Sequence, residues 1–215
     1  MIEVKSISKK YKKGNAVFTA LEDVSFGITK GEFVCVFGPS GAGKSTLLNI
    51  IGGLIHPDNG TVTFNGDSLY SNGTDLDLFR KKQVGFMFQQ FHLMPYLNLY
   101  DNIRLACFEK NQFDKIGLFL EKCSLMPLRY KYPSELSVGE KQRTAFIRAI
   151  ITNPAILLAD EPTGNLDPGN TEILLSMIKE FQAASGTVVV VTHDPLISGY
   201  SNRKIMLDKG RLISN

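Results

Sequence analysis

Hydrophobic and polar residues alternate along the first part of the chain. Residues 2–30 alternate in short stretches, and Thr61–Phe64 lies between two Asn-Gly turn signals. Alternation with a period of two is typical of strands that pack on one face and meet solvent on the other. Asn-Gly pairs favour tight turns between such strands. This part of the sequence therefore predicts an antiparallel sheet.

Three later stretches are continuously apolar: Phe33–Phe37, Ile156–Ala159 and Thr187–Thr192. Such runs are typical of parallel strands that helices cover on both faces. Glu172–Ala184, between the last two runs, carries one apolar stripe and is followed by Gly186, as expected for a crossover helix. These stretches predict an α/β fold with a parallel sheet.

The stretch between Phe91 and Ile151 contains no comparable apolar run. Lys115–Lys122 and Lys141–Ile151 instead have the periodicity of amphipathic helices. We therefore expect a small helical insert within the parallel-sheet part of the chain.

Composition narrows the class of protein. The 215 residues, 43% of them hydrophobic, suffice for one large core or for a core with a small subdomain. The apolar runs are far shorter than the roughly 20 residues of a membrane helix, and residues 1–8 do not resemble a secretory signal, so we predict a cytoplasmic protein. Cys35, Cys107 and Cys123 lack metal-type spacing and are expected to be reduced thiols. The net charge of +3 does not indicate nucleic-acid binding.

Residues 38–45 have the pattern G-x-x-x-x-G-K-S between a strand-like run and a helix-like stretch that opens at Thr46. Glycines let the chain curl so that backbone N–H groups point at a phosphate, and the following helix adds partial positive charge. Leu47, Ile50, Ile51 and Leu54 have helical spacing, which supports the order strand, loop, helix. In such loops the lysine, here Lys44, reaches the β- and γ-phosphates, and Ser45 ligates Mg²⁺. The predicted phosphate-binding residues are Gly38, Pro39, Ser40, Gly41, Ala42, Gly43, Lys44, Ser45 and Thr46.

Two carboxylates follow the apolar run that ends at Ala159. Asp160 and Glu161 would emerge at the carboxyl end of a parallel strand, where α/β sheets bind ligands. Asp160 can hold Mg²⁺ through water, and Glu161 can polarise the water that attacks a γ-phosphate. The alternative is that both carboxylates only cap the turn at Pro162.

A second anion site is expected at the start of the predicted helix Lys141–Ile151. Ser137 and Glu140 have the spacing of a capping box, and the N-terminus of a helix attracts anions.

With the phosphate loop, the Asp-Glu pair and the serine-led helix start together, the chain resembles the ATP-binding subunit of ABC transporters over nearly all of its length. The resemblance implies a P-loop NTPase (RecA-like) core with an antiparallel β subdomain and an inserted α-helical subdomain. It implies one ABC ATPase domain, 1–215. Residues 1–89 and 152–215 would form the core with the antiparallel subdomain, and 90–151 the helical subdomain.

The resemblance also implies ATP and Mg²⁺ as ligands and a head-to-tail homodimer. Ser137 and Gly139 match the signature motif that reaches the γ-phosphate on the partner chain. By motif, Tyr11 would stack on adenine, Gln89 belongs to the Q-loop, Asp167 to the D-loop, and His193 would be the switch histidine. Taken singly, Tyr11 fits better as a cover for a sheet edge than as an adenine-stacking residue, and His193 better as an ordinary strand-end residue than as a catalytic one. The implied catalytic residues are Glu161, His193 and Lys44, and the implied metal ligands are Ser45, Gln89 and Asp160.

The detailed sequences of two motifs suggest a subfamily. Phe88–Pro95 and Asp160–Pro168 look like the group of lipoprotein-releasing, macrolide-exporting and cell-division ATPases. This implies a separate membrane permease that docks near Phe91 to Ile103 and holds the chain peripherally on the inner face of the membrane. A division-regulating ATPase, or a soluble cassette ATPase such as one for iron-sulfur assembly, is the alternative.

Two departures from the family pattern stand out. Val138 occupies a signature position that is normally glycine, and the stretch Ile103–Tyr132 looks several residues short. If position 138 needs a positive φ, valine is strained there. If it has the dihedrals of a helix start, valine fits.

Overall fold

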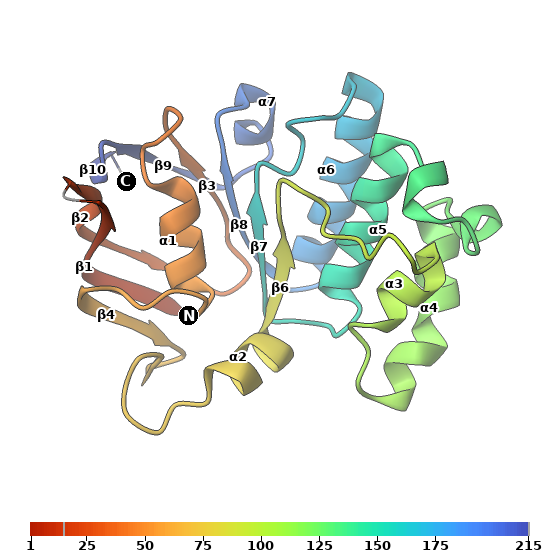
Figure 1. Cartoon of the computed structure of the whole chain (residues 1–215), viewed down its shortest axis with the longest axis horizontal. Coiled ribbons are helices and arrows are strands. Elements are labelled where there is room, and N and C mark those ends of the chain that lie inside the picture. Colours follow the sequence, from red (N-terminus) through yellow and green to blue (C-terminus); the bar gives the residue numbers. More distant parts are fainter. Residues whose placement is uncertain (15, 215) are drawn as a thin grey trace.

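The computed structural model describes residues 1–14 and 16–214 and contains two sheets. The smaller sheet is antiparallel, and its strands follow the order β2-β1-β4-β5 (Figure 1). These strands are β1 (Ile2–Lys13), β2 (Ala16–Ile28), β4 (Asn59–Phe64) and β5 (Asp67–Ser68). The antiparallel sheet expected from the alternating pattern is confirmed.

The larger sheet has six strands in the order β10-β9-β3-β8-β7-β6. All neighbouring pairs are parallel except β9 with β10. Its strands are β3 (Phe33–Phe37), β6 (Val84–Met87), β7 (Ile156–Asp160), β8 (Thr187–Thr192), β9 (Arg203–Asp208) and β10 (Arg211–Ser214). The three predicted parallel strands lie side by side at its centre.

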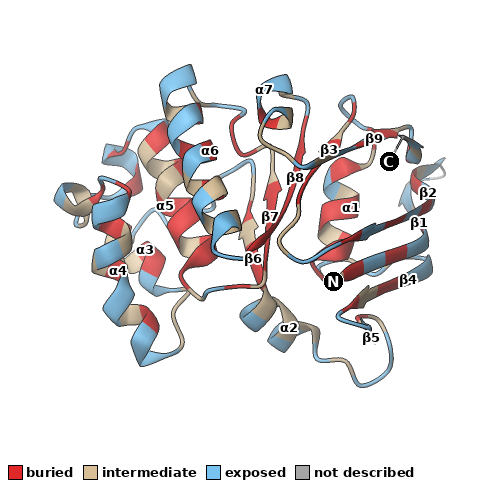
Figure 2. Cartoon of the chain, turned by 180° about the vertical axis from the view of Figure 1, so that it is seen from behind, coloured by how far each residue is buried: buried red, intermediate tan, exposed pale blue. Residues whose placement is uncertain are grey.

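Helices cover both faces of this sheet. α1 (Lys44–Ile51) lies between the two sheets, and α5 (Val138–Ile150) and α6 (Pro168–Ala183) cover the opposite face (Figure 1). Side chains of β3 divide between the two layers: Val34 and Val36 pack in the core around α1, and Phe33 and Cys35 in the core under α5 and α6. In Figure 2 the central parallel strands are buried along most of their length, whereas β1 and β4 alternate between buried and exposed positions.

A third hydrophobic core lies in the predicted helical insert. Leu99, Ile116 and Ile147 are among its buried residues. The elements around it are α3 (Leu99–Arg104), α4 (Lys110–Lys122), α5 and the 3₁₀ turns Met126–Leu128 and Pro133–Glu135. The structure thus confirms the predicted fold class, α/β with an antiparallel sheet and a helical insert.

All four helices expected from the sequence begin earlier than expected, α4 at Lys110 instead of Lys115 and α5 at Val138 instead of Lys141. α1 begins at Lys44, not Thr46, and ends at Ile51, so Leu54 lies beyond the helix and is exposed. α6 begins at Pro168, four residues before Glu172, because the Asp167 side chain accepts the Asn170 N–H and proline fits the first helical position. Polar first turns hide such starts from a search for apolar periodicity.

The sequence patterns missed several short elements, among them the strands β5, β6, β9 and β10 and the helices α2 (Leu76–Gln83), α3 and α7 (Pro195–Ser198). β6 is only four residues long and contains Gly85, which lowers its strand signal. This glycine allows close packing, because a Cβ at position 85 would overlap with the Ala149 carbonyl oxygen of α5. Helix α7 follows β8.

All three cysteines are free. Burial raises the pKa of Cys35 and of Cys123 to about 12, so both thiols stay protonated at neutral pH. No helix within residues 1–14 and 16–214 has the length and apolar character needed to span a membrane.

Candidate functional site

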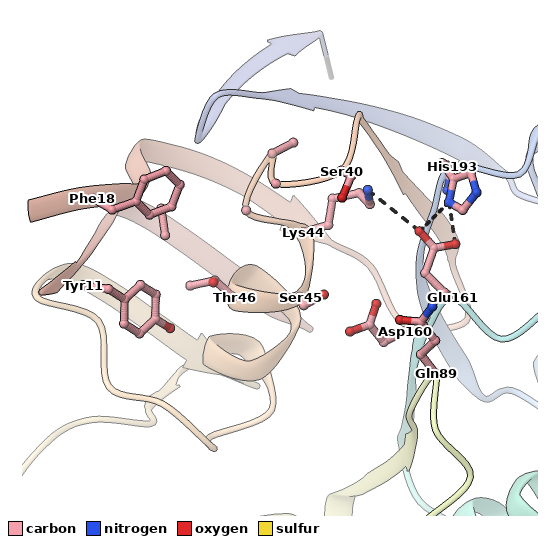
Figure 3. Close-up of a pocket in the computed structure, with 14 residues that line it drawn as sticks. Tyr11, Phe18, Ser40, Lys44, Ser45, Thr46, Gln89, Asp160, Glu161 and His193 are labelled. Atoms are coloured by element: carbon pink, nitrogen blue, oxygen red, sulfur yellow. Dashed lines mark hydrogen bonds and ion pairs between the residues drawn. The ribbon is translucent and has the colours of Figure 1, made fainter. Parts of the chain in front are cut away.

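A pocket of about 340 Å³ lies where the phosphate loop meets the carboxyl ends of the parallel strands. Figure 3 shows Tyr11 and Phe18 at one end of it and Gln89, Asp160, Glu161 and His193 at the other, with the phosphate loop between. The lining residues are Tyr11, Phe18, Ala20, Ser40, Gly41, Ala42, Gly43, Lys44, Ser45, Thr46, Gln89, Asp160, Glu161 and His193. Most of the predicted nucleotide-contacting residues therefore converge on one pocket.

The phosphate loop uses two glycines in left-handed conformations. Gly41 has a φ of 79° and Gly43 a φ of 100°, both unfavourable for residues with a Cβ. Gly43 also caps the N-terminus of α1, and a Cβ at this position would overlap with the Ala20 carbonyl oxygen of β2. The glycine thus allows the loop to turn into α1 close against the antiparallel sheet.

Lys44 is buried at the centre of the pocket, with 7% of its side chain exposed. Its Nζ donates to the carbonyl oxygens of Gly38 (2.7 Å) and Pro39 (3.1 Å), and it lies 3.8 Å from a carboxylate oxygen of Glu161. Gly38 and Pro39 therefore hold the lysine by their carbonyls and do not line the pocket themselves. A buried ammonium on a phosphate loop is a strong point charge for an anionic ligand.

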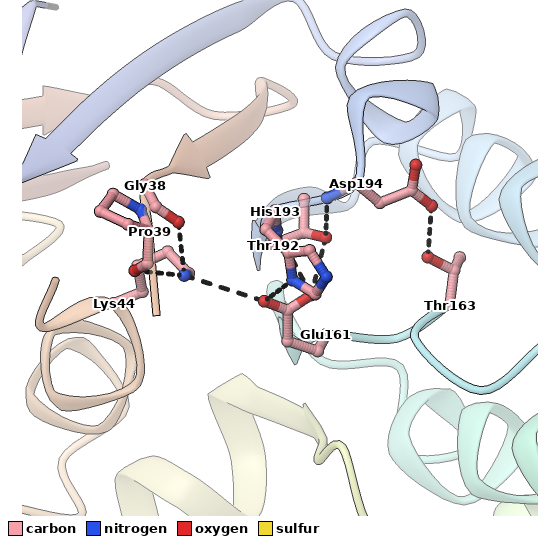
Figure 4. A network of polar contacts seen from close by, with 8 residues as sticks. All are labelled: Gly38, Pro39, Lys44, Glu161, Thr163, Thr192, His193 and Asp194. Carbon is pink, nitrogen blue, oxygen red and sulfur yellow. Dashed lines mark hydrogen bonds and ion pairs between the residues drawn. The ribbon is translucent and has the colours of Figure 1, made fainter. Parts of the chain in front are cut away.

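Glu161 accepts hydrogen bonds from the end of β8 (Figure 4). Thr192 Oγ1 donates to its carboxylate over 2.9 Å, the His193 N–H over 3.3 Å, and the His193 ring Nδ1 lies 2.8 Å away. The backbone of Glu161 has a φ of 45°, which is uncommon for a residue with a Cβ and turns the chain directly after β7. These contacts fix the direction of a mostly buried carboxylate that points at Lys44.

Asp160 ends β7 beside Ser45. Burial raises its pKa above the ordinary value, and the neighbouring Ser45 hydroxyl and Lys44 ammonium oppose that shift. Within residues 1–14 and 16–214, His, Cys, Asp and Glu side chains form no group of three that would hold a metal ion alone. One carboxylate, one hydroxyl and the nearby Gln89 amide instead fit Mg²⁺, which keeps waters and takes substrate phosphate oxygens as ligands.

Phe18 is a pocket residue that sequence reasoning missed. It pairs directly with Tyr11 across the β1–β2 hairpin, and 57% of it is exposed, against 39% of Tyr11. Directly paired residues of antiparallel strands lie on the same face of the sheet. The hairpin register, in which Lys13 pairs with Ala16, would have placed Phe18 opposite Tyr11.

Besides Gly38 and Pro39, the predicted site residues Ser137, Gly139 and Asp167 lie outside the pocket. Ser137 caps α5 in a capping box with Glu140, as expected: its hydroxyl accepts the Glu140 N–H (3.3 Å), and its own N–H donates to the Glu140 carboxylate (2.7 Å). Asp167 caps α6, and hydrogen bonds from Asn170 lower its pKa. Both capping side chains are exposed, so this part of the chain presents helix N-termini to the outside.

Val138 is the first residue of α5 and does not have a positive φ. Of the two conformations considered from the sequence, it therefore has the unstrained one. The valine is 41% exposed.

α5 also contacts the segment that follows Gln89. Arg148 donates to the carbonyl oxygens of Phe91 (2.7 Å) and His92 (2.6 Å), and its burial lowers its pKa without threatening its charge. Beyond this clamp, Met94 and Tyr96 are exposed.

The sequence of this chain is similar to that of known ATP-binding proteins. The family model described as ABC transporter matches residues 21–164, and one described as an AAA domain of a putative AbiEii toxin, type IV TA system, matches 130–199. The lipoprotein-releasing system ATP-binding protein LolD of Buchnera aphidicola is 37% identical over 92% of this chain and 90% of its own. The macrolide export ATP-binding/permease protein MacB of Bdellovibrio bacteriovorus is 36% identical, over 100% of this chain and 34% of its own length.

Solved structures of an ABC transporter cassette have the same fold as this chain. The ABC transporter ATP-binding protein MJ0796 of Methanocaldococcus jannaschii is 40% identical over 99% of this chain and 95% of its own. Its dimeric structure has a TM-score of 0.92 at 37% identity and covers 100% of this chain and 97% of that one. A second structure of it, a dimeric post-hydrolysis state with bound ADP and Pi, also has a TM-score of 0.92, at 35% identity and with the same coverage. The chain with this phosphate-loop pocket therefore belongs to the ABC transporter family, as an ATP-binding subunit and ATPase.

Proposed function

We propose that two copies of this chain bind MgATP between them, head to tail, and couple its hydrolysis to a separate membrane permease. One observation carries the proposal: Lys44 and Glu161 line a pocket, whereas Ser137 and Asp167 of the same chain face outward elsewhere. Each outward set would complete the pocket of the other copy. The dimeric structures of MJ0796 support this arrangement.

ATP would lie along the pocket with its base on the aromatic end. Tyr11 offers a face for stacking on adenine, and the backbone N–H groups of the phosphate loop would receive the phosphates. The Lys44 ammonium would release the carbonyl oxygens of Gly38 and Pro39 and bind the β- and γ-phosphates instead. Hydrogen bonds to charged phosphate oxygens are stronger than those to carbonyl groups. The residues assigned to nucleotide contact that line this pocket are Tyr11, Ser40 to Thr46 and Gln89, while Gly38 and Pro39 hold Lys44 through their carbonyl groups.

Glu161 would act as the general base. A water oxygen attacks the γ-phosphorus, the bond from that phosphorus to the β,γ-bridging oxygen breaks, and the water proton passes to the Glu161 carboxylate. Thr192 and His193 hold this carboxylate in place, so little reorganisation is needed during the reaction. His193, on the exposed side, would contact the γ-phosphate and sense its presence.

Ser45, Gln89 and Asp160 would hold Mg²⁺ together with phosphate oxygens. The ion supplies charge neutralisation at the β- and γ-phosphates. Ser45 and Asp160 already lie beside each other in the pocket (Figure 3).

The N-terminus of α5 would complete the site of the other copy. Ser137 and Val138 are exposed at the start of α5, whereas Gly139 is buried, and the N-terminus of a helix favours an anion such as a γ-phosphate. Asp167 would contact the phosphate loop of the partner copy. A single chain would then bind ATP but hydrolyse it slowly.

The permease would dock near Phe91 to Ile103 and hold the chain on the inner face of a membrane. Met94 and Tyr96 supply exposed apolar surface there, and Arg148 fixes the segment before them. The names of LolD and MacB, a subunit of a lipoprotein-releasing system and a fused ATP-binding/permease protein, support a transporter partner.

The experiment mixes two inactive variants. Lys44→Ala disables the pocket and keeps the outward set, whereas Ser137→Arg blocks the outward set and keeps the pocket. Each homodimer should have almost no ATPase activity. After mixing, a heterodimer has one intact composite site, so random exchange should restore about a quarter of wild-type activity. No recovery, with both variants folded by circular dichroism and shown to exchange, would contradict the head-to-tail arrangement.

A further inference from the structure

We propose that Asn170 is a positioning residue that fixes the N-terminus of α5 to the Asp167 loop of the same chain. This inference rests on the proposed composite site, because both elements would contact the nucleotide site of the other copy. Asn170 would make them approach that site as one rigid unit.

The Asn170 amide joins two elements from different parts of the fold. Its Oδ1 accepts a hydrogen bond from Arg143 Nη1 of α5 over 2.6 Å. Its Nδ2 donates to Asp167 Oδ2 over 2.6 Å, and its backbone N–H donates to Asp167 Oδ1 over 2.9 Å. The Asn170 side chain thus accepts a hydrogen bond from the helical insert and donates one to the loop that leads into α6.

Direct packing adds to these bonds. A Cβ at Gly139 would overlap with the amide group of Asn170. The absence of a side chain at position 139 therefore allows Asn170 to lie against the backbone of the first turn of α5. Glycine here serves contact within the chain, in addition to any approach of a phosphate.

Loss of the Asn170 amide would remove one side-chain contact from each of two charged residues, Arg143 and Asp167. The Arg143 Nε is buried and has no hydrogen-bond partner among residues 1–14 and 16–214. The bond from Arg143 Nη1 to Asn170 Oδ1 is therefore important for satisfying this guanidinium. On the other side, the Asn170 backbone N–H and side-chain amide both donate to the exposed Asp167 carboxylate and lower its pKa, and these two bonds orient the carboxylate towards Asn170. Hydrogen bonds to charged groups are among the stronger ones in proteins.

Asn170 and Arg143 do not line the nucleotide pocket. Their removal should therefore leave ATP binding to the single chain unchanged and weaken the step in which two chains close on ATP. A residue that only stabilised the fold would lower thermal stability without this selective effect.

The experiment compares Asn170→Ala with Arg143→Met and with the double variant, all in the Glu161→Gln background that should trap the ATP-bound dimer. We expect Asn170→Ala to raise the dimer dissociation constant about ten- to hundredfold, from the strength of hydrogen bonds to charged groups. Affinity for a fluorescent ATP analogue, measured at concentrations where the chain is monomeric, should change less than about twofold, within ordinary surface-variant scatter. The double variant should be no worse than Asn170→Ala, because the two residues act on the same contact.

Two controls separate the explanations. Glu172→Ala, an exposed position on the same helix, should dimerise like the parent. Asn170→Asp keeps the acceptor for Arg143 but repels Asp167, so it should weaken the dimer even where Asn170→Ala folds poorly.

The outcomes are distinct. If Glu161→Gln alone forms no ATP-dependent dimer, the proposed function fails, and this inference fails with it. If the parent dimerises and Asn170→Ala and Asn170→Asp dimerise as tightly, only this inference is overturned. It is also overturned if the effects of Asn170→Ala and Arg143→Met add fully.

Discussion

The phosphate-loop pocket and the outward helix starts are built in opposite ways. In the pocket, Lys44 and Glu161 contact each other and are held by groups from the loop and from β8. Outside the pocket, the side chains of Ser137 and Asp167 cap the N-termini of their own helices and remain exposed. The pocket is thus preorganised within one chain, whereas in the proposed dimer Ser137 and Asp167 would meet a ligand only when a second chain arrives. Substitutions in the pocket should change ATP binding or hydrolysis directly, and substitutions at Ser137 and Asp167 should first change dimer formation.

The most severe test of the pocket is Glu161→Gln. Because Glu161 is the carboxylate directed at the phosphate side of the pocket, its loss as a base should lower kcat by about 10²- to 10⁴-fold. MgATP binding should persist, and a stable ATP-bound dimer should appear on size exclusion. Steady-state turnover within threefold of the wild type would remove Glu161 from its assigned role.

A second substitution tests the proposed surface for the permease. Tyr96→Asp places a charge on a residue that is 72% exposed, and permease copurification from detergent-solubilised membranes should be lost. Basal ATPase should remain, because Tyr96 does not line the pocket. Tyr130→Asp, at a tyrosine that is 67% exposed, is the matched control and should keep the permease. Loss of ATPase together with copurification would show that Tyr96 supports the fold.

Lys44→Ala and Ser137→Ala should separate the two regions directly. Removal of the lysine takes away a charge from the phosphates, so ATP affinity of the single chain should fall about tenfold or more. Ser137→Ala should leave that affinity nearly unchanged and weaken ATP-dependent dimer formation. Isothermal titration measures the first effect and analytical ultracentrifugation the second. Equal loss of single-chain affinity in both variants would erase the distinction between the regions.

Val138→Gly should change turnover less than about fivefold, because the valine already has the ordinary backbone conformation of a helix start and is not strained there. Glycine at this exposed position would remove only a side chain and some helix preference. Steady-state ATPase at saturating MgATP measures the effect. A tenfold or larger gain would mean that the valine restrains closure of the composite site.

The smallest effect concerns stability. The folded-state pKa of Asp160 is raised, so its contribution is favourable at low pH and is lost as pH rises through that pKa. At a pH above that pKa the charged, half-buried carboxylate therefore destabilises the protein without ligand, and Asp160→Asn should raise Tm by roughly 1–4 °C. The difference should vanish as the pH falls towards the ordinary aspartate pKa of 3.8. A lower Tm for the variant at a pH above that pKa would contradict this account.

Sequence patterns sufficed where the physical requirement is local. The phosphate loop needs Gly41 and Gly43 at fixed spacing, and the central strand β8 is continuously apolar because both of its faces are covered. The pattern failed where tertiary contacts decide. Phe18 joins the pocket through hairpin register, and β6 exists because β7 offers it a parallel partner. Asn170 has its role only because α5 and α6 lie side by side (Figure 1).

The geometry of α5 has a mechanical consequence. The helix carries Ser137 at its first end and Arg148 near its last, and Arg148 grips the backbone after Gln89 by two carbonyls. With 13 residues the helix is about 20 Å long. A rocking motion of about 5° around its midpoint would shift its two ends by nearly 1 Å in opposite directions, given that length. Displacement of the Phe91–His92 backbone would therefore arrive at Ser137 as a movement of comparable size, as in a lever with equal arms.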